Sequence, residues 1–247
     1  MMSIDAIFKE IAKRNGLDEF TYDENRADAL RIQKEEELQQ KINNAIKDRE
    51  DKLNSLEYSN IPNKFRDMAF SDLIINEYNE QMIKQCSHYV KNFDSYRKGM
   101  GFIGDMGVGK TTLMAIMGQQ LIKNNKLSVY FATEEAILDE VRRSYDDASL
   151  DNPEDIIRRI GKYDVIMIDE LGQTTTDWGI ATLKRIIDTA INNNSRLFVT
   201  TNYTSVQLLE RWNESSNNKT PNQVIDRMAE AMDFYKVKGE SFRRKEW

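Results

Sequence analysis

The sequence predicts an α/β fold, in which helices flank a parallel β-sheet and a small all-α region precedes it. Three observations predict this fold. A glycine-rich loop stands between a short apolar run and an apolar-spaced helix, further apolar runs alternate with helical patterns, and residues 1–60 show helical spacing alone. The 247 residues, 40% of them hydrophobic, suffice for one such domain with a smaller appendage.

The glycine-rich loop runs from Gly104 to Thr111 and fits the phosphate-binding pattern G-x-x-x-x-G-K-S/T without a gap or a substitution. Its glycines let the backbone fold tightly around phosphates, so that N–H groups at a helix N-terminus point at the anion. Lys110 is expected to neutralise the β- and γ-phosphates of a nucleoside triphosphate, and the Thr111 hydroxyl to bind Mg²⁺. A glycine-rich turn without a ligand is the alternative, which the flanking strand and helix disfavour. The expected nucleotide contacts are Gly104, Asp105, Met106, Gly107, Val108, Gly109, Lys110, Thr111 and Thr112.

Two further apolar runs end in polar side chains. The run Val165-Ile166-Met167-Ile168 is typical of a strand buried on both faces, and Asp169 and Glu170 follow it. Because α/β sheets place ligands at the carboxyl ends of their strands, we expect Asp169 to bind Mg²⁺ and Glu170 to polarise a water for attack on the γ-phosphate. The run 197–201 ends at Asn202, whose amide is expected to hold that water. Ordinary strand ends with turn residues are the alternative for both runs.

The N-terminal region is predicted to be helical. Apolar residues at helical spacing follow Ser3 and form one face of a short helix: Ile4, Ile7, Phe8 and Ile11. That face either packs on its own domain or docks into a partner's groove. A long helix from about residue 23 to residue 57 has a thin apolar stripe, typical of a bundle or coiled-coil element. Pro62 ends it, so we expect divisions at residues 1–60 (helical), 61–97 (linker and helix) and 98–247 (α/β domain).

The remaining helices and strands alternate, as a parallel sheet requires. A helix reaching residue 93 carries Cys86 on its apolar face, where a thiol is expected to pack as a small hydrophobe. Strands are expected at residues 101–103, 129–132, 165–168, 197–201 and 234–238. Helices are expected at residues 134–145, from 153, at 182–191, at 205–212 and from 221.

Charge and composition exclude several classes of protein. The net charge of −6 argues against a protein that holds nucleic acid through a uniform basic surface. Residues 1–60 are net −4 and residues 236–247 are net +3, so any DNA contact should be local. One cysteine and one histidine exclude a Cys/His zinc site. No apolar run approaches the ~18 residues of a membrane span and no signal peptide is recognisable, so we expect a cytoplasmic protein without membrane contact.

As a set, these residues resemble the AAA+ ATPases, and within them the DnaC/DnaI-type helicase loaders and the related IstB transposition helpers. The resemblance covers most of the chain from about Phe65 to Arg243, and its more discriminating motifs are Val224-Ile225-Asp226-Arg227-Met228 and Gly239-Glu240-Ser241-Phe242-Arg243. It implies an AAA+ P-loop NTPase with a five-stranded parallel sheet, in which Asp169 and Glu170 are the Walker B pair and Asn202 is sensor 1.

The same resemblance assigns two arginines. Arg227 is implied to be an arginine finger that enters a neighbouring subunit's site, so the protein would self-associate through the ATP site and hydrolyse ATP there. Arg243 looks like the terminal arginine of these proteins. It is either a sensor 2-like contact to the nucleotide or part of a basic surface tail.

The resemblance also implies partners. The segment after the second strand resembles a helical insert that faces DNA in loader assemblies. It makes Arg142 and Arg143 candidate phosphate contacts and Tyr145 a candidate stacking ring for single-stranded DNA, with an exposed helical face as the alternative. One departure is that Thr189-Ala190-Ile191 stand where loaders commonly carry a basic residue. Residues 1–60 would dock a DnaB-type hexameric replicative helicase.

The expected function is therefore ATP-dependent loading of a replicative helicase onto single-stranded DNA. A transposition helper of the IstB kind and an ATP-gated adaptor with little turnover are the alternatives. A small-molecule kinase is disfavoured, because Glu170, Asn202 and Arg227 together suit hydrolysis of ATP rather than transfer to a bound metabolite.

Overall fold

The computed structural model describes residues 10, 13–16, 31–44, 46–47, 57, 59–146, 151–215 and 219–242. The chain divides into two structural units, Met1–Asp51 and Lys52–Trp247. In the first unit residues 31–44 and 46–47 are helical and exposed, including the apolar Leu38, Ile42 and Ile46. They lie within the long helix predicted from the sequence. The docking candidates Ile4, Ile7, Phe8 and Ile11 lie outside the described residues.

The second unit is built on five parallel strands in the order β2-β3-β4-β1-β5. Their bounds are β1 Gly99–Ile103, β2 Val129–Thr133, β3 Val165–Leu171, β4 Arg196–Thr201 and β5 Met232–Lys236. The predicted five-stranded parallel sheet is confirmed. The last strand begins two residues earlier than predicted, because the preceding helix ends at Ala231 and Met232 pairs directly with Gly99.

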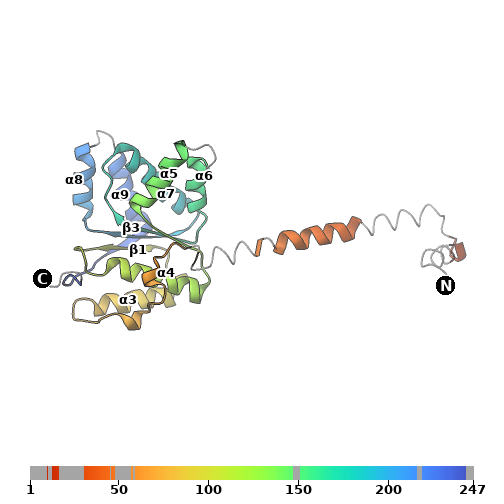
Figure 1. Cartoon of the computed structure of the whole chain (residues 1–247), viewed down its shortest axis with the longest axis horizontal. Helices are drawn as coiled ribbons and strands as arrows, with labels where there is room; N and C mark the ends of the chain where they lie inside the picture. Colours follow the sequence, from red (N-terminus) through yellow and green to blue (C-terminus); the bar gives the residue numbers. More distant parts are fainter. Residues whose placement is uncertain are drawn as a thin grey trace. The chain divides into compact units, whose positions relative to one another are not determined.

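Helices cover both faces of the sheet (Figure 1). On one face lie α3 (Glu80–Lys91) and α4 (Lys110–Asn125). On the other lie α5 (Glu134–Asp146), α6 (Pro153–Ile160), α7 (Asp177–Asn192), α8 (Ser205–Ser215) and α9 (Thr220–Ala231). Three short 3-10 helices are η1 (Asn63–Phe65), η2 (Phe70–Asp72) and η3 (Phe93–Ser95).

The two faces of the sheet contribute to two separate hydrophobic cores. Along β3, Val165 and Met167 pack in the core beneath α3 and α4, whereas Ile166 and Ile168 pack in the core beneath α5 to α9. This alternation follows from the two-residue period of a strand. It also explains why β3 reads as a continuous apolar run, since both of its faces are buried.

The segment before α3 packs on the domain instead of leaving it. Phe131 N donates to Ser59 O at 2.8 Å, on the β2 edge that faces away from β3, and Ile61 is 1% exposed. Gln119 of α4 donates to the carbonyls of Phe65 and Met68. This segment therefore packs against the middle of α4.

Cys86 packs as predicted. The side chain is fully buried within α3, and burial raises the pKa of the thiol to about 12, which makes it a poor nucleophile. The described part of the chain contains no helix that combines the length and hydropathy needed to cross a bilayer.

Candidate nucleotide-binding site

A cavity of about 500 Å³ opens where the glycine-rich loop meets the carboxyl ends of β3 and β4. Its volume is in the range of small-molecule sites. One wall is formed by residues 106–113, the glycine-rich loop and the first turn of α4, together with the polar side chains of Glu170, Gln173, Thr200 and Asn202. The structure thus brings together three stretches that the sequence analysis selected separately.

The glycine-rich loop has the backbone geometry that its glycines permit. Gly107 and Gly109 have φ angles of +89° and +96°, in the left-handed region, and α4 begins immediately afterwards at Lys110. A Cβ atom on Gly107 would come within 2.2 Å of Ser241 Oγ, because the segment after β5 crosses the loop at this point. Phe242 N donates to Gly107 O at 3.1 Å. The loop is therefore enclosed from the C-terminal side.

Lys110 is buried at the centre of the site. Its Nζ donates to the carbonyls of Gly104 and Asp105 and to Asn202 Oδ1, each at 2.8 Å. These oxygen partners hold the ammonium group at the mouth of the loop. The contact also places Asn202 beside the loop, next to the end of β3, as the sequence analysis expected.

Thr111 and Asp169 lie in direct contact. Thr111 Oγ1 donates to Asp169 Oδ1 at 2.9 Å, and Thr200 Oγ1 donates to the same oxygen at 2.5 Å. A hydroxyl oxygen and a carboxylate oxygen that lie side by side are suitable ligands for Mg²⁺, which prefers oxygen ligands. The donor set present therefore fits the metal that the sequence predicts.

Thr200 was missed by the sequence analysis. Its hydroxyl also accepts from Glu170 N at 3.0 Å, so a single β4 side chain fixes both acidic residues. Glu170 has a φ of +59° at an irregularity in the β3–β4 register, and its side chain is exposed at the rim of the cavity. A polar residue at position 200, near the end of an apolar strand, was the sequence signal that could have identified Thr200.

The other wall of the cavity is mostly apolar, although Lys64, Asp72 and Asn79 also line it, and this wall too was missed. It is formed by side chains of the segment before α3 and of α3 itself: Phe65, Met68, Leu73, Ile74 and Ile83. Phe242 closes the cavity from the C-terminal segment. An apolar wall opposite a phosphate-binding loop suits a planar ring such as a nucleobase. The apolar residues of the expected linker were the signal that could have indicated it.

Arg227 is not one of the described residues that line this cavity. It lies on α9, where Nε is 3.0 Å from Asp188 Oδ1 of α7 and Nη1 donates to Glu230 Oε2 at 2.6 Å. Glu230 and then Asp188 raise the pKa of the guanidinium, which stays charged. Arg243, the other arginine taken from the resemblance, lies outside the described residues.

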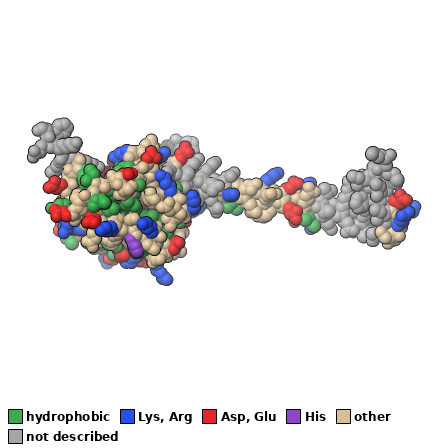
Figure 2. Space-filling view, turned by 90° about the horizontal axis from the view of Figure 1, so that it is seen from below, with side chains coloured by type: hydrophobic (Ala, Val, Ile, Leu, Met, Phe, Trp, Pro, Cys, Tyr) green, Lys and Arg blue, Asp and Glu red, His purple; other side chains and the backbone are tan. Residues whose placement is uncertain are grey.

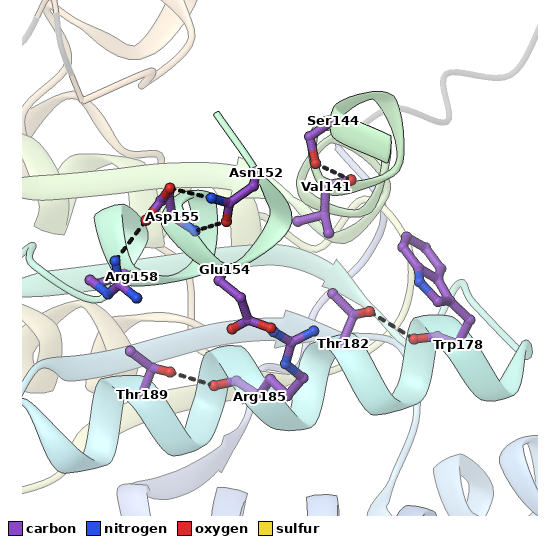
Figure 3. Close-up of polar contacts among 10 residues, drawn as sticks. All are labelled: Val141, Ser144, Asn152, Glu154, Asp155, Arg158, Trp178, Thr182, Arg185 and Thr189. Carbon is purple, nitrogen blue, oxygen red and sulfur yellow. Dashed lines mark hydrogen bonds and ion pairs between the residues drawn. The ribbon is translucent and has the colours of Figure 1, made fainter. Parts of the chain in front are cut away.

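The DNA candidates on α5 divide into two groups. The Arg142 guanidinium lies 5.0 Å from the centre of the Trp178 ring, and the Tyr145 ring lies 6.4 Å from it at a steep angle. Figure 3 shows Trp178 on the first turn of α7, on the side facing α5. Arg143 instead borders a separate hollow beside β2. Trp178 was missed, because nothing in its local sequence indicates that it meets α5.

Exposed apolar side chains accompany the nucleotide cavity. Figure 2, which views the molecule from the side of α3 and α4, shows hydrophobic side chains gathered on this surface. In the segment before α3, Ile74, Ile75 and Tyr78 are each more than half exposed, and so is Met106 of the loop. An apolar rim of this kind is common where another protein binds.

Comparison with known proteins gives consistent results. The family model described as "IstB-like ATP binding protein" matches residues 26–247. The replicative helicase loader DnaC of Buchnera aphidicola subsp. Schizaphis graminum (strain Sg) is 25% identical over 109 residues, which is 44% of this chain and 44% of that relative's length.

Solved structures show the same fold. The crystal structure of DnaI superposes with a TM-score of 0.61 at 22% identity, covering 74% of this chain and 94% of the other. The crystal structure of the DnaC helicase loader gives a TM-score of 0.61 at 21% identity, covering 72% and 100%. At these identities the superpositions establish an AAA+ P-loop fold.

Proposed function

Because the chain belongs to the family of IstB-like ATP-binding proteins, we propose that it is an ATP-dependent loader of a replicative helicase. In this proposal it binds a hexameric helicase in the cytoplasm, delivers it to single-stranded DNA, and hydrolyses ATP where two copies of the chain meet. The observation that carries the proposal is the cavity lined by Lys110, Thr111, Glu170 and Asn202, with Asp169 hydrogen-bonded to Thr111 beside it. A relative named as a replicative helicase loader supports the choice of partner.

The arrangement suits hydrolysis of a nucleoside triphosphate. Lys110 would exchange its carbonyl partners for β- and γ-phosphate oxygens, and the apolar wall would receive the base. Mg²⁺ held by Thr111 and Asp169 would neutralise charge on the phosphates. Glu170 would orient and polarise the attacking water, with Asn202 fixing it from the neighbouring strand end. Thr200 would keep both acids in place through its two hydrogen bonds.

Arg227 would complete the site of a second copy. Arg227 lies outside the cavity of its own subunit, and this position supports a role in the cavity of a neighbouring subunit. Asp188 and Glu230 hold the guanidinium in the single chain, so assembly would require it to reorient towards the neighbouring γ-phosphate. ATP turnover would then report on assembly.

The proposed contact to single-stranded DNA is formed by Arg142, Tyr145 and Trp178. We expect Trp178→Ala to weaken binding by about 1–3 kcal/mol, because a base would lose its stacking surface. Arg142→Ala should lower the slope of log affinity against log salt by about 0.7, the share of one phosphate contact on a single strand. Fluorescence anisotropy with a labelled thymidine oligonucleotide measures both.

Arg158→Ala is the matched control, since Arg158 is exposed on α6 and pairs with Asp155 at 2.6 Å (Figure 3). It should leave affinity and salt slope unchanged. Equal binding by all three variants would place the DNA contact elsewhere on the protein.

The proposed helicase contact is the N-terminal region, residues 1–60. The measurement is native mass spectrometry of the chain mixed with the helicase hexamer, with ATP and after hydrolysis. We expect a complex with ATP, loss of loader subunits after hydrolysis, and no complex for Phe8→Asp, which places a charge on the predicted apolar face. Retained binding by Phe8→Asp would show that docking lies elsewhere.

The family match also supports a second candidate, a transposition helper of the IstB kind. The two functions share the ATP site and differ in their partner. Capture of a transposase instead of a helicase in the same measurement would favour the second.

A further inference from the structure

Glu134, the first residue of α5, is a fully buried carboxylate that the mechanism above does not use. It stands beside the end of β2, and the hydroxyl of the preceding Thr133 caps the helix by accepting from Ala136 N. The Glu134 carboxylate does not take that role. It extends away from its own helix to a distant part of the chain.

Its partners are backbone groups of the loop that follows the acidic pair. Gly172 N donates to Glu134 Oε2 and Thr174 N donates to Oε1, each at 2.5 Å. Burial raises the pKa of Glu134, while the N–H groups of Thr174, Gly172 and Gln173 and the charge of Arg211 act in the opposite direction. A carboxylate removed from water needs such donors, so the contact is specific.

The loop held by Glu134 adjoins the ATP site. Gln173 lines the cavity, and the preceding Leu171 is bound to β4 through Thr201 Oγ1 at 2.7 Å. From the opposite side, Arg211 Nε donates to Gly172 O and Trp212 Nε1 donates to Thr174 O. The loop two residues after Glu170 is therefore fixed by β4, α8 and α5 together.

The same helix meets the chain beyond this loop a second time. The loop leads into α7, whose Trp178 lies beneath the guanidinium of Arg142 on α5. Helix α5 thus contacts the segment 172–178 at two points. Its first turn contacts the segment through Glu134, and its C-terminal half through the side chains proposed to bind DNA.

We propose that Glu134 is a positioning residue that couples α5 to the catalytic end of β3. Nucleic acid bound by Arg142, Tyr145 and Trp178 fixes the position of α5. The hydrogen bonds of Glu134 then fix the backbone of residues 172–174 relative to α5, and through that backbone they set the orientation of Glu170. The inference rests on the proposed function, because it assumes that α5 contacts DNA and that Glu170 acts on ATP. It adds a route by which DNA sets the rate of hydrolysis.

The first test compares Glu134→Gln with Glu135→Gln. Glutamine keeps the size of the side chain but places an NH₂ group against an N–H donor, whereas Glu135 is exposed in the same turn and provides the matched control. We expect Glu134→Gln to lower the DNA-stimulated kcat by about tenfold to a hundredfold, as a small misplacement of a catalytic group does. The KM for ATP and the affinity for DNA should stay at the wild-type values, because Glu134 touches neither ligand.

The ratio of stimulated to unstimulated kcat separates coupling from general damage. A merely destabilised protein would lose both rates, and DNA binding, in proportion to its folded fraction. We expect the ratio itself to fall towards one in Glu134→Gln and to be unchanged in Glu135→Gln. A ratio equal to that of the wild type would overturn the coupling.

The second test does not depend on turnover. Amide hydrogen exchange at Gly172, Gln173 and Thr174 should accelerate in Glu134→Gln and not in Glu135→Gln. It should also accelerate in Val141→Gly, a variant that loosens α5 while retaining Glu134. Unchanged exchange in Glu134→Gln would refute the positioning role. A wild type without ATPase activity would refute the proposed function instead, and the exchange result would still decide whether α5 and the loop are linked.

Discussion

Replacing Glu170 with glutamine is expected to lower kcat for ATP hydrolysis by about 10²–10⁴-fold, the range typical for loss of a general base. Glutamine retains the size of the side chain but cannot accept a proton from the attacking water. Affinity for ATP should be unchanged, because Lys110 and Thr111 remain and the Thr200 contact uses the backbone of residue 170. Steady-state phosphate release with single-stranded DNA measures kcat, and a fluorescent ATP analogue measures binding.

Glu135→Gln removes an exposed carboxylate of α5 and serves as the control, with wild-type turnover expected. If Glu170→Gln and the wild type hydrolyse ATP equally slowly, the protein is an adaptor that uses ATP only to assemble. That result would leave the nucleotide cavity intact and remove hydrolysis from the proposed function.

Replacing Arg227 with alanine is expected to lower kcat by about 10³-fold or more in the assembled protein, the lower end of what an arginine finger contributes. The loss arises because charge that develops on the γ-phosphate would no longer be compensated by the neighbouring subunit. ATP affinity of the separate chain should be unaffected, since Arg227 lies on α9 outside the cavity. Phosphate release at increasing protein concentration measures the effect.

Mixing the two inactive variants tests whether the site is shared. An Arg227→Ala subunit keeps its own Glu170, and a neighbouring Glu170→Gln subunit supplies Arg227, so some interfaces in the mixture are complete. We expect ATPase activity to reappear on mixing. Arg185→Ala, which removes an arginine of α7 paired with Glu154 (Figure 3), should behave as wild type. Failure of the mixture to recover activity would place Arg227 outside the catalytic site.

The α/β fold and half of the candidate site were predictable because they depend on neighbouring residues. The phosphate loop, with Gly107 and Gly109 in the left-handed region before α4, is encoded by eight consecutive positions. The acids at the end of β3 follow a run whose length and apolarity identify a buried strand. The parallel topology then places the ends of β3 and β4 together, and this puts Asn202 beside the acidic residues.

Element boundaries were less predictable, for a physical reason visible at two places. Helix α7 begins at Asp177, five residues before the predicted start, because Thr176 caps it by accepting from Gly179 N. Strand β5 begins at Met232 because its pairing with β1 decides the register. Capping and pairing depend on contacts that the apolar pattern does not record.

The sequence by itself determined that this protein has a phosphate-binding loop, an acidic strand end and a parallel sheet, since each is written in one continuous stretch. Only the tertiary structure decided that Thr200 fixes both acids, that the segment before α3 forms the apolar wall, and that Trp178 lies under Arg142. It also decided that Glu134 of α5 holds the loop after Glu170. These contacts join residues about 30 or more positions apart, and the free energy of such a contact depends on burial and distance, which the folded chain alone defines.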